Sequence, residues 1–166
     1  MSGTKPIYYW DACVYLAWLK KETSKHLSSI EAIAEENKKR NNIIVTSVIT
    51  KLEVLDASLT ADQERSFGEC FSFGTHELYE LDAGVALKAR EYRSFYFKNP
   101  VGGKKLPVPD AIHLATAFVC QSDEFHTFDD GGKGGISLLA LNGNVAGNPI
   151  KICHPFLQGT KSLFTP

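Results

Sequence analysis

The sequence predicts an α/β fold, a three-layer α/β/α sandwich with a central, mostly parallel sheet. Short apolar runs that suit strands alternate with segments that have the apolar spacing and the end residues of helices. Strands buried on both faces of a parallel sheet have such nearly continuous apolar runs, and parallel neighbours need helical crossovers. No repeat or linker interrupts the 166 residues. We therefore expect one domain over residues 1–166, with a C-terminal extension from about residue 136.

Four apolar runs are the predicted strands, and a fifth is a predicted edge strand. They are rich in aromatic and β-branched residues and are bounded by polar or glycine-containing stretches. The runs cover residues 7–10, 43–46, 74–81, 124–128 and 150–153.

Helices are predicted between these strands from apolar periodicity and from their end residues. Ser28 with Glu31, and Thr60 with Gln63, have the spacing of capping boxes, in which two side chains accept hydrogen bonds from backbone N–H groups at a helix start. Asp82 is a predicted N-cap. The predicted helices cover about residues 12–21, 28–41, 48–57, 61–73, 83–97 and 110–120, with a helical turn at 136–141.

Composition limits the classes of function. The formal net charge of −1 gives no global field for polyanions, so nucleic-acid binding would need a local basic patch. No apolar run is long enough to span a membrane, and the first residues lack the pattern of a signal peptide. The four cysteines are scattered among apolar residues without a C-x-x-C pair, which favours reduced core thiols over disulfides or a zinc site. We expect a soluble, cytoplasmic protein.

Four acidic residues occupy comparable places relative to the predicted strands. Asp11 follows the first strand and Asp129 follows the fourth. Glu53 lies in the helix after the second strand, and Asp110 begins a strongly apolar helix. Ligands of open α/β sheets gather beyond the carboxyl ends of the strands, so we expect these four side chains to converge. Each alone also has an ordinary explanation, as a strand-end, solvated or helix-start residue.

Converging carboxylates repel one another, by roughly 4 kcal/mol per pair at about 4 Å and an effective dielectric constant near 20. Such a cluster must raise some of its pKa values or bind cations. Oxygen ligands select hard ions such as Mg²⁺ or Mn²⁺, which lower the pKa of a bound water and stabilise the charge of a phosphoryl group. The sequence therefore predicts a metal-dependent phosphodiester hydrolase that needs no protein nucleophile.

The motifs around these acids resemble those of the PIN-domain nucleases, most closely the VapC-type toxins of bacterial toxin–antitoxin pairs. The resemblance runs from Tyr8 to about Asp130 and rests on Y-Y-W-D-A-C, I-V-T-S-V-I-T-K-L-E-V-L, V-P-D-A-I-H-L-A-T-A and H-T-F-D. The element P-D-A-x-x-L-A-T-A is the most specific of these. The chain differs from compact members of the family in its length, its D-G-G-K-G-G turn and its extended C-terminal segment.

The resemblance implies a PIN-like fold and a catalytic site in which Asp11, Glu53, Asp110 and Asp129 bind Mg²⁺ or Mn²⁺. It implies hydrolysis of RNA phosphodiesters to 5′-phosphate and 3′-hydroxyl ends. It further implies a homodimer, and a cognate antitoxin whose peptide covers the acidic pocket.

Two neighbours of the last acid are further candidates. Thr127 matches the small hydroxyl residue two positions before that acid in the family, and would orient a carboxylate or a water. Asp130 could share or replace the role of Asp129, although the T-x-D spacing favours Asp129. His113, one turn after Asp110, is interpreted as a satisfied buried histidine rather than a metal ligand.

Basic residues near these motifs are candidate RNA contacts. Lys104 and Lys105 lie in a Gly-Gly loop and could grip a phosphate backbone, although a solvated loop is an equal explanation. Arg93 lies among aromatic residues, which suits an RNA-contacting face, a helix that covers the core or a dimer surface. Lys51, in the helix after the second strand, has the same ambiguity.

Two other classes of function stay open beside an RNA-cleaving toxin. The chain could be a PIN nuclease that processes RNA or acts on DNA without an antitoxin, or an inactive PIN module used for binding. A haloacid-dehalogenase-type phosphatase is excluded, because it needs a second acid two residues after Asp11, where this chain has Cys13.

Overall fold

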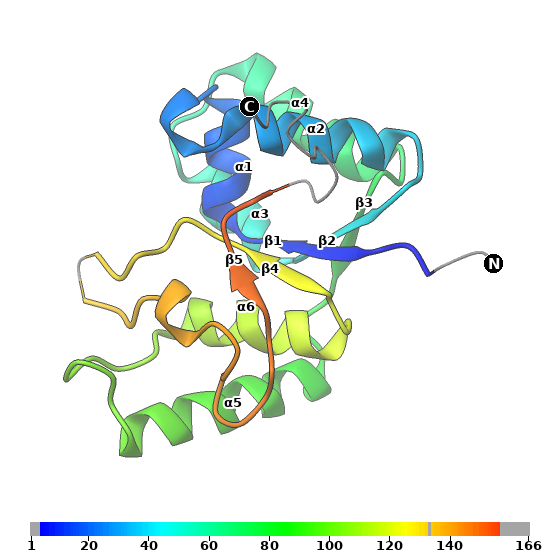
Figure 1. Cartoon of the computed structure of the whole chain (residues 1–166). Coiled ribbons are helices and arrows are strands. Elements are labelled where there is room, and N and C mark those ends of the chain that lie inside the picture. Colours follow the sequence, from blue (N-terminus) through cyan, green and yellow to red (C-terminus); the bar gives the residue numbers. More distant parts are fainter. Residues whose placement is uncertain (1–3, 133, 157–166) are drawn as a thin grey trace, which may run out of the picture.

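The computed structural model describes residues 4–132 and 134–156 of the chain. A five-stranded sheet forms its centre, with every neighbouring pair parallel and the strand order β3-β2-β1-β4-β5 (Figure 1). This confirms the predicted parallel α/β fold. The strands are β1 (Ile7–Trp10), β2 (Ile43–Ser47), β3 (His76–Tyr79), β4 (Glu124–His126) and β5 (Ile152–Cys153).

Helices cover both faces of the sheet, as a three-layer sandwich requires. The first four lie on one face, and α5 and α6 lie together on the other (Figure 1). No helix in the described part of the chain is both long and apolar enough to cross a membrane. The helices are α1 (Ala12–Leu19), α2 (Leu27–Lys38), α3 (Ile49–Leu55), α4 (Ala61–Ser72), α5 (Ala83–Lys98) and α6 (Val108–Val119), with 3₁₀ turns η1 (Thr23–Lys25) and η2 (Leu139–Leu141).

The central strand β1 contributes side chains to both cores. Tyr8 and Trp10 pack under α1 and α2, whereas Tyr9 packs on the α5–α6 side. This alternation explains why the run is apolar throughout, because a central strand has no solvent-facing side. Tyr9 pairs with Val45 of β2 and Phe125 of β4, so the carboxyl ends of these three strands meet at one edge.

The segment after residue 135 completes the core on the α5–α6 side. Ile136, Leu138, Leu141 and Val145 are buried in the same cluster as the apolar face of α6. The strand β5 then pairs with β4 and closes that edge of the sheet. These residues therefore share one hydrophobic core with the rest of the fold.

The prediction that Ser28 caps a helix is wrong. The helix α2 begins at Leu27, and the N–H groups of Ser29 and Ile30 donate to the carbonyl of His26. His26 has a left-handed backbone (φ 53°) and sets the entry into the helix. Ser28 therefore lies inside the first turn of α2, and its side chain does not cap the helix.

The second predicted capping box is confirmed. Thr60 Oγ1 accepts from the Gln63 N–H at 3.3 Å, and the Thr60 N–H donates to Gln63 Oε1 at 2.9 Å. Asp82 is also confirmed as an N-cap, since Oδ1 accepts from the Val85 N–H at 2.8 Å.

The start of the helix that carries Asp110 was predicted two residues late. The helix α6 begins at Val108, because Pro109 is tolerated in a first turn, where its missing N–H would have no helical partner. The predicted strands at 74–81 and 124–128 are shorter in the structure, at four and three residues.

Thr60, which caps α4, and Ser28, which lies inside α2, make a matched test of the cap assignments. We predict that Thr60→Ala lowers the free energy of unfolding by about 1 kcal/mol, because a helix N-terminal N–H loses its acceptor. Ser28→Ala should change it by less than about 0.5 kcal/mol. Urea denaturation followed by circular dichroism measures both, and an equal loss in the two variants would contradict the cap assignment.

Candidate active site

The four predicted acids all lie at the carboxyl edge of the sheet. Asp11 directly follows β1, and Asp129 follows β4 after two residues. Glu53 is carried by α3, which begins where β2 ends, and Asp110 lies in the first turn of α6. Four segments distant in the chain thus bring carboxylates to one edge of the sheet.

Asp11 is held in place by the start of α1. Its side chain is the N-cap of the helix, and Oδ1 accepts from the N–H groups of Cys13 at 3.1 Å and Val14 at 3.3 Å. The Cys13 thiol donates to the same oxygen at 2.7 Å. Only 5% of Asp11 is exposed, and this burial raises the pKa of its carboxyl. The carboxylate is therefore fixed but poorly compensated.

The pKa of Asp110 depends on the charges of the other three acids. Burial and then the neighbouring charge of Asp129 raise the pKa of Asp110 to about 6. Asp11 and Glu53 add to the same rise. The pKa of Asp110 therefore responds to the charges of the three other acids, while the nearby His113 acts in the opposite direction.

Asp129 is fixed by the backbone around it. Its Oδ1 accepts from the Gly131 N–H at 2.9 Å, and its Oδ2 accepts from the Leu138 N–H at 3.3 Å. The buried Thr127 hydroxyl accepts the N–H of Asp129 itself at 2.9 Å. Asp130 is exposed and is not among the charges that raise the pKa of Asp110.

Two glycines let the turn after Asp129 lie close to the site. Gly131 has φ +88°, and a Cβ there would approach the Ser137 nitrogen to 2.8 Å, so only glycine fits. A Cβ on Gly135 would lie 3.1 Å from Pro107 and 3.5 Å from Asp110 Oδ2. Gly135 therefore lies beside Asp110, and Gly131 packs against Ser137.

Glu53 has a partner that the sequence identified only as a buried histidine. His113 is 3% exposed and its Nε2 lies 2.7 Å from Glu53 Oε2. Its Nδ1 lies 2.7 Å from the hydroxyl of Tyr9. The interpretation of His113 as a satisfied buried histidine is thus confirmed, and its spacing of three residues from Asp110 is what aims it at the same edge.

The two lysines of the Gly-Gly loop make contacts within the protein. Lys104 Nζ donates to the carbonyls of Gly131 at 2.6 Å and Gly132 at 3.3 Å, and so ties the loop to the turn after Asp129. Lys105 Nζ lies 4.7 Å from the centre of the Phe97 ring, in cation–π geometry.

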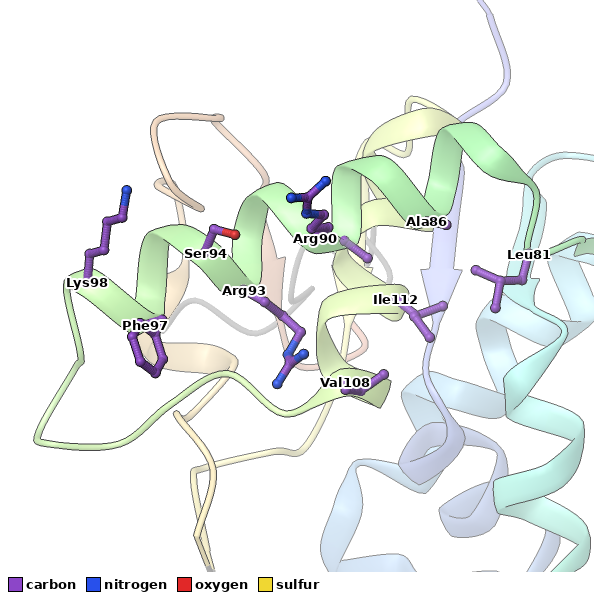
Figure 2. A pocket seen from close by; sticks show the side chains of 10 residues that line it. Leu81, Ala86, Arg90, Arg93, Ser94, Phe97, Lys98, Val108 and Ile112 are labelled. Carbon is purple, nitrogen blue, oxygen red and sulfur yellow. The ribbon is translucent and has the colours of Figure 1, made fainter.

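The remaining basic candidates also have intramolecular partners. Lys51 lies 5.1 Å from the ring centre of Phe71. Arg93 donates through Nε to the Leu106 carbonyl at 3.4 Å and lines a groove of about 470 Å³ between α5 and α6 (Figure 2). The exposure of these cations alone therefore does not mark an RNA surface. Other side chains at the groove are Leu81, Arg90, Phe97, Lys98, Val108 and Ile112.

A second group of ligand-type side chains was missed from the sequence. In residues 4–132 and 134–156, one trio of such residues has ligand atoms all within 4.8 Å: Glu124, His126 and Cys153. His126 Nδ1 accepts from the Trp10 indole N–H at 3.1 Å, so the ring proton is on Nε2, 2.8 Å from Glu124 Oε2. No signal marked this trio, since Cys153 lies far from the others in the sequence.

This trio is better explained as a hydrogen-bonded part of the core than as a metal site. A neutral His126 that accepts at Nδ1 has no second lone pair for a metal. Hydrogen bonds from His126 and Lys151 lower the pKa of Glu124 to about 2, and burial raises the pKa of the Cys153 thiol to about 11. A thiol that keeps its proton is a poor ligand.

The four acids are more widely spaced than this trio. Among the described residues, no three of them bring carboxylate oxygens within 4.8 Å of one another. Mg²⁺ keeps several of its waters and uses one or two carboxylates directly, so a wider acidic edge suits it. The oxygen-only donor set therefore fits a hydrated hard cation.

The raised pKa of Asp110 gives a stability test in the absence of metal. Its folded pKa of about 6 lies above the ordinary 3.8, so the protein loses stability as the pH rises through this range. We predict that Asp110→Asn stabilises the metal-free protein at pH 7.5 by about 1–2 kcal/mol, after allowance for the lost helix-dipole interaction. The gain should vanish near pH 4; urea denaturation in EDTA at both pH values measures it. A destabilised variant at pH 7.5 would contradict the buried-charge interpretation.

Solved structures with this fold are known. The chain is similar to VapBC2 from Rickettsia felis bound to a promoter DNA fragment, with 15% identity and a TM-score of 0.61, over 89% of this chain and 98% of that one. It is similar to FitAcB from Neisseria gonorrhoeae, with 17% identity and a TM-score of 0.55, over 89% of this chain and 97% of that one. It is also similar to a toxin–antitoxin complex from Klebsiella pneumoniae, with 21% identity and a TM-score of 0.51, over 78% of this chain and 94% of that one. A search of curated proteins found no match to the sequence.

The family assignment comes from the sequence itself. The family model described as the PIN domain matches residues 8–132, which span all four acids and the first four strands of the sheet. This confirms the resemblance drawn from the acidic motifs: the chain belongs to the PIN-domain family of nucleases.

Proposed function

We propose that this protein is a Mg²⁺- or Mn²⁺-dependent endoribonuclease and the toxin of a toxin–antitoxin pair. The observation that carries the proposal is that four carboxylates, on four segments distant in the sequence, lie at the carboxyl edge of the sheet within the part of the chain that matches the PIN domain. The raised pKa of Asp110, to which burial contributes most and the charge of Asp129 next, agrees with this arrangement. An edge that gathers four carboxylates at such an electrostatic cost is suited to a bound cation. Membership in a nuclease family directs that chemistry to phosphodiesters.

Asp11, Glu53, Asp110 and Asp129 would hold the cation. When bound, the cation supplies an activated water and neutralises charge on the phosphate under attack. The chain's own contribution is rigidity. The α1 N-terminus fixes Asp11, His113 holds Glu53, and two backbone N–H groups fix Asp129.

Thr127 supports two of these acids. Its hydroxyl accepts the N–H of Asp129, and its hydrogen bond to Asp11 partly offsets the rise in the pKa of that carboxyl. We propose it as an orienting residue for both carboxylates. Asp130, exposed and outside the charges felt by Asp110, is assigned no ligand role.

The substrate would approach across the basic residues near this edge. Arg93 and Lys105 are exposed, and each spends only part of its hydrogen-bonding capacity on the contacts described above. We propose these two, with Lys51, as contacts to the RNA backbone. Lys104 is better assigned to holding the turn after Asp129, since it donates to two carbonyls there.

Partners are proposed from the neighbouring structures. The Klebsiella pneumoniae protein is described as a toxin–antitoxin complex, and the Rickettsia felis structure contains VapBC2. By analogy, we propose a cognate antitoxin that covers the acidic edge, and a homodimer as the assembly of the free chain.

Asp11→Asn is the sharpest test of the proposed activity. Asn caps a helix as well as Asp does, so the fold should be retained while a ligand charge is lost. We predict the loss of Mn²⁺-dependent cleavage of single-stranded RNA, by at least about 100-fold, from the general cost of removing an electrostatic catalytic group. Asp82→Asn is the matched control, because Asp82 caps α5 on an exposed surface.

The outcomes of this test separate the alternatives. Cleavage of RNA by Asp11→Asn at the parent rate would contradict the assigned site. If the parent protein cleaves DNA but not RNA, the substrate class is DNA. If the parent cleaves neither nucleic acid in a metal-dependent way, a binding module is favoured.

Asp129 and Asp130 can be separated by the same substitution. We predict that Asp129→Asn weakens cleavage by at least about 10-fold, whereas Asp130→Asn leaves it within about 2-fold, because only Asp129 faces the other acids. Initial rates at saturating Mn²⁺ measure both. The reverse order would assign the ligand role to Asp130.

A further inference from the structure

Glu53 stands at the end of a buried chain of hydrogen bonds. The backbone N–H of Ser47 donates to the Tyr9 hydroxyl at 3.1 Å, and that hydroxyl lies 2.7 Å from His113 Nδ1. His113 Nε2 then lies 2.7 Å from Glu53 Oε2. Tyr9 is fully buried and His113 is 3% exposed, so the contact between these two side chains is enclosed in the core, whereas Glu53 is partly exposed. The chain links the backbone of β2 to the carboxylate on α3.

The direction of these bonds follows from what each group can donate. A carboxylate only accepts, so the proton between the last pair is on His113 Nε2. In a neutral imidazole with its proton on Nε2, Nδ1 is an acceptor, so the Tyr9 hydroxyl, which itself accepts the Ser47 N–H, donates to Nδ1. Tyr9 thereby makes Nδ1 the acceptor of the ring and leaves Nε2–H as its donor. Both ring nitrogens are used, so His113 has no lone pair for a metal.

We propose that Tyr9 and His113 are positioning residues that fix Glu53 for metal binding. They hold Oε2 and leave Oε1 for the cation. This inference rests on the proposed function, because Tyr9 and His113 have a positioning role only if Glu53 is a metal ligand. Neither residue contacts the cation or the substrate in this assignment.

Glu53 needs such a support more than the other acids do. Asp11 and Asp129 accept hydrogen bonds from backbone N–H groups of their own segments. The Glu53 side chain is longer and 34% exposed, and its one hydrogen bond among the described residues comes from His113. A free Glu side chain would lose rotamer entropy on binding a metal, and the hydrogen bond from His113 removes part of that loss beforehand.

The protein contains a matched pair that serves as a control. On the opposite face of the sheet, the Tyr15 hydroxyl lies 2.9 Å from His76 Nδ1, and both residues are buried. Tyr15 packs in the core on the side of α1 and α4, and among the described residues the hydrogen bond of this pair involves none of the four acids. Tyr15→Phe removes the same kind of buried bond as Tyr9→Phe, but away from Glu53.

The experiment measures Mn²⁺ binding by calorimetry and the histidine tautomer by ¹⁵N nuclear magnetic resonance, both with the full chain and without RNA. Parent His113 should have an unprotonated Nδ1. Tyr9→Phe should spread the proton over both nitrogens and weaken Mn²⁺ binding by about 10- to 100-fold, the usual cost of losing a partner of a metal ligand. Tyr15→Phe should bind Mn²⁺ like the parent.

A second pair of variants covers the case in which Tyr9→Phe fails to fold. Gln at position 113 keeps an N–H donor, whereas Leu does not, so His113→Gln should bind Mn²⁺ more tightly than His113→Leu. Equal affinities in this pair, equal affinities of Tyr9→Phe and Tyr15→Phe, or a proton on His113 Nδ1 in the parent would overturn the positioning role. A parent that binds no Mn²⁺ would instead overturn the proposed function, whatever the tautomer.

Discussion

The burial of carboxylates, Asp11 and Asp110 above all, at one edge of a parallel sheet is the constraint on which this structure depends. The strand order places β1 between β2 and β4, so the segments that follow these three strands must meet. Asp11, Glu53 and Asp129 are brought together by that topology, and α6 adds Asp110. Burial then raises the pKa of both Asp11 and Asp110. The fold thus imposes an electrostatic cost at this edge, which hydrogen bonds and the nearby His113 offset only in part.

The fold and the acidic edge could be predicted because they depend on patterns that are local in the sequence. Continuous apolar runs identified the strands, and their alternation with helices implied parallel pairing. The place of each acid just beyond a strand or at a helix start was then enough to expect convergence. For the same reason the Thr60–Gln63 box was confirmed, since its hydrogen bonds join residues three apart.

The errors and omissions involve contacts that no local pattern contains. Ser28 has the right spacing for a cap, but the left-handed backbone at His26 starts the helix one residue before it. The bonds from Lys104 to the Gly131 carbonyl and from Trp10 to His126 join residues 27 and 116 positions apart. Such contacts follow from the packing of the finished fold, so the sequence offered the residues without their partners.

The same packing decides where the compensating charge for the acids must come from. Among the described residues, no lysine or arginine forms an ion pair with any of the four acids. The one histidine among these contacts, His113, is hydrogen-bonded to the tyrosine of the central strand and to Glu53, and its Coulomb interaction with Asp11 and Asp110 offsets only part of the rise in their pKa values. The protein thus orients Asp11 and Asp129 mainly with backbone N–H groups and a thiol, and the charge of the acidic edge is only partly offset. Neutral donors preserve the attraction of the edge for a cation, whereas a lysine at the same place would compete with it.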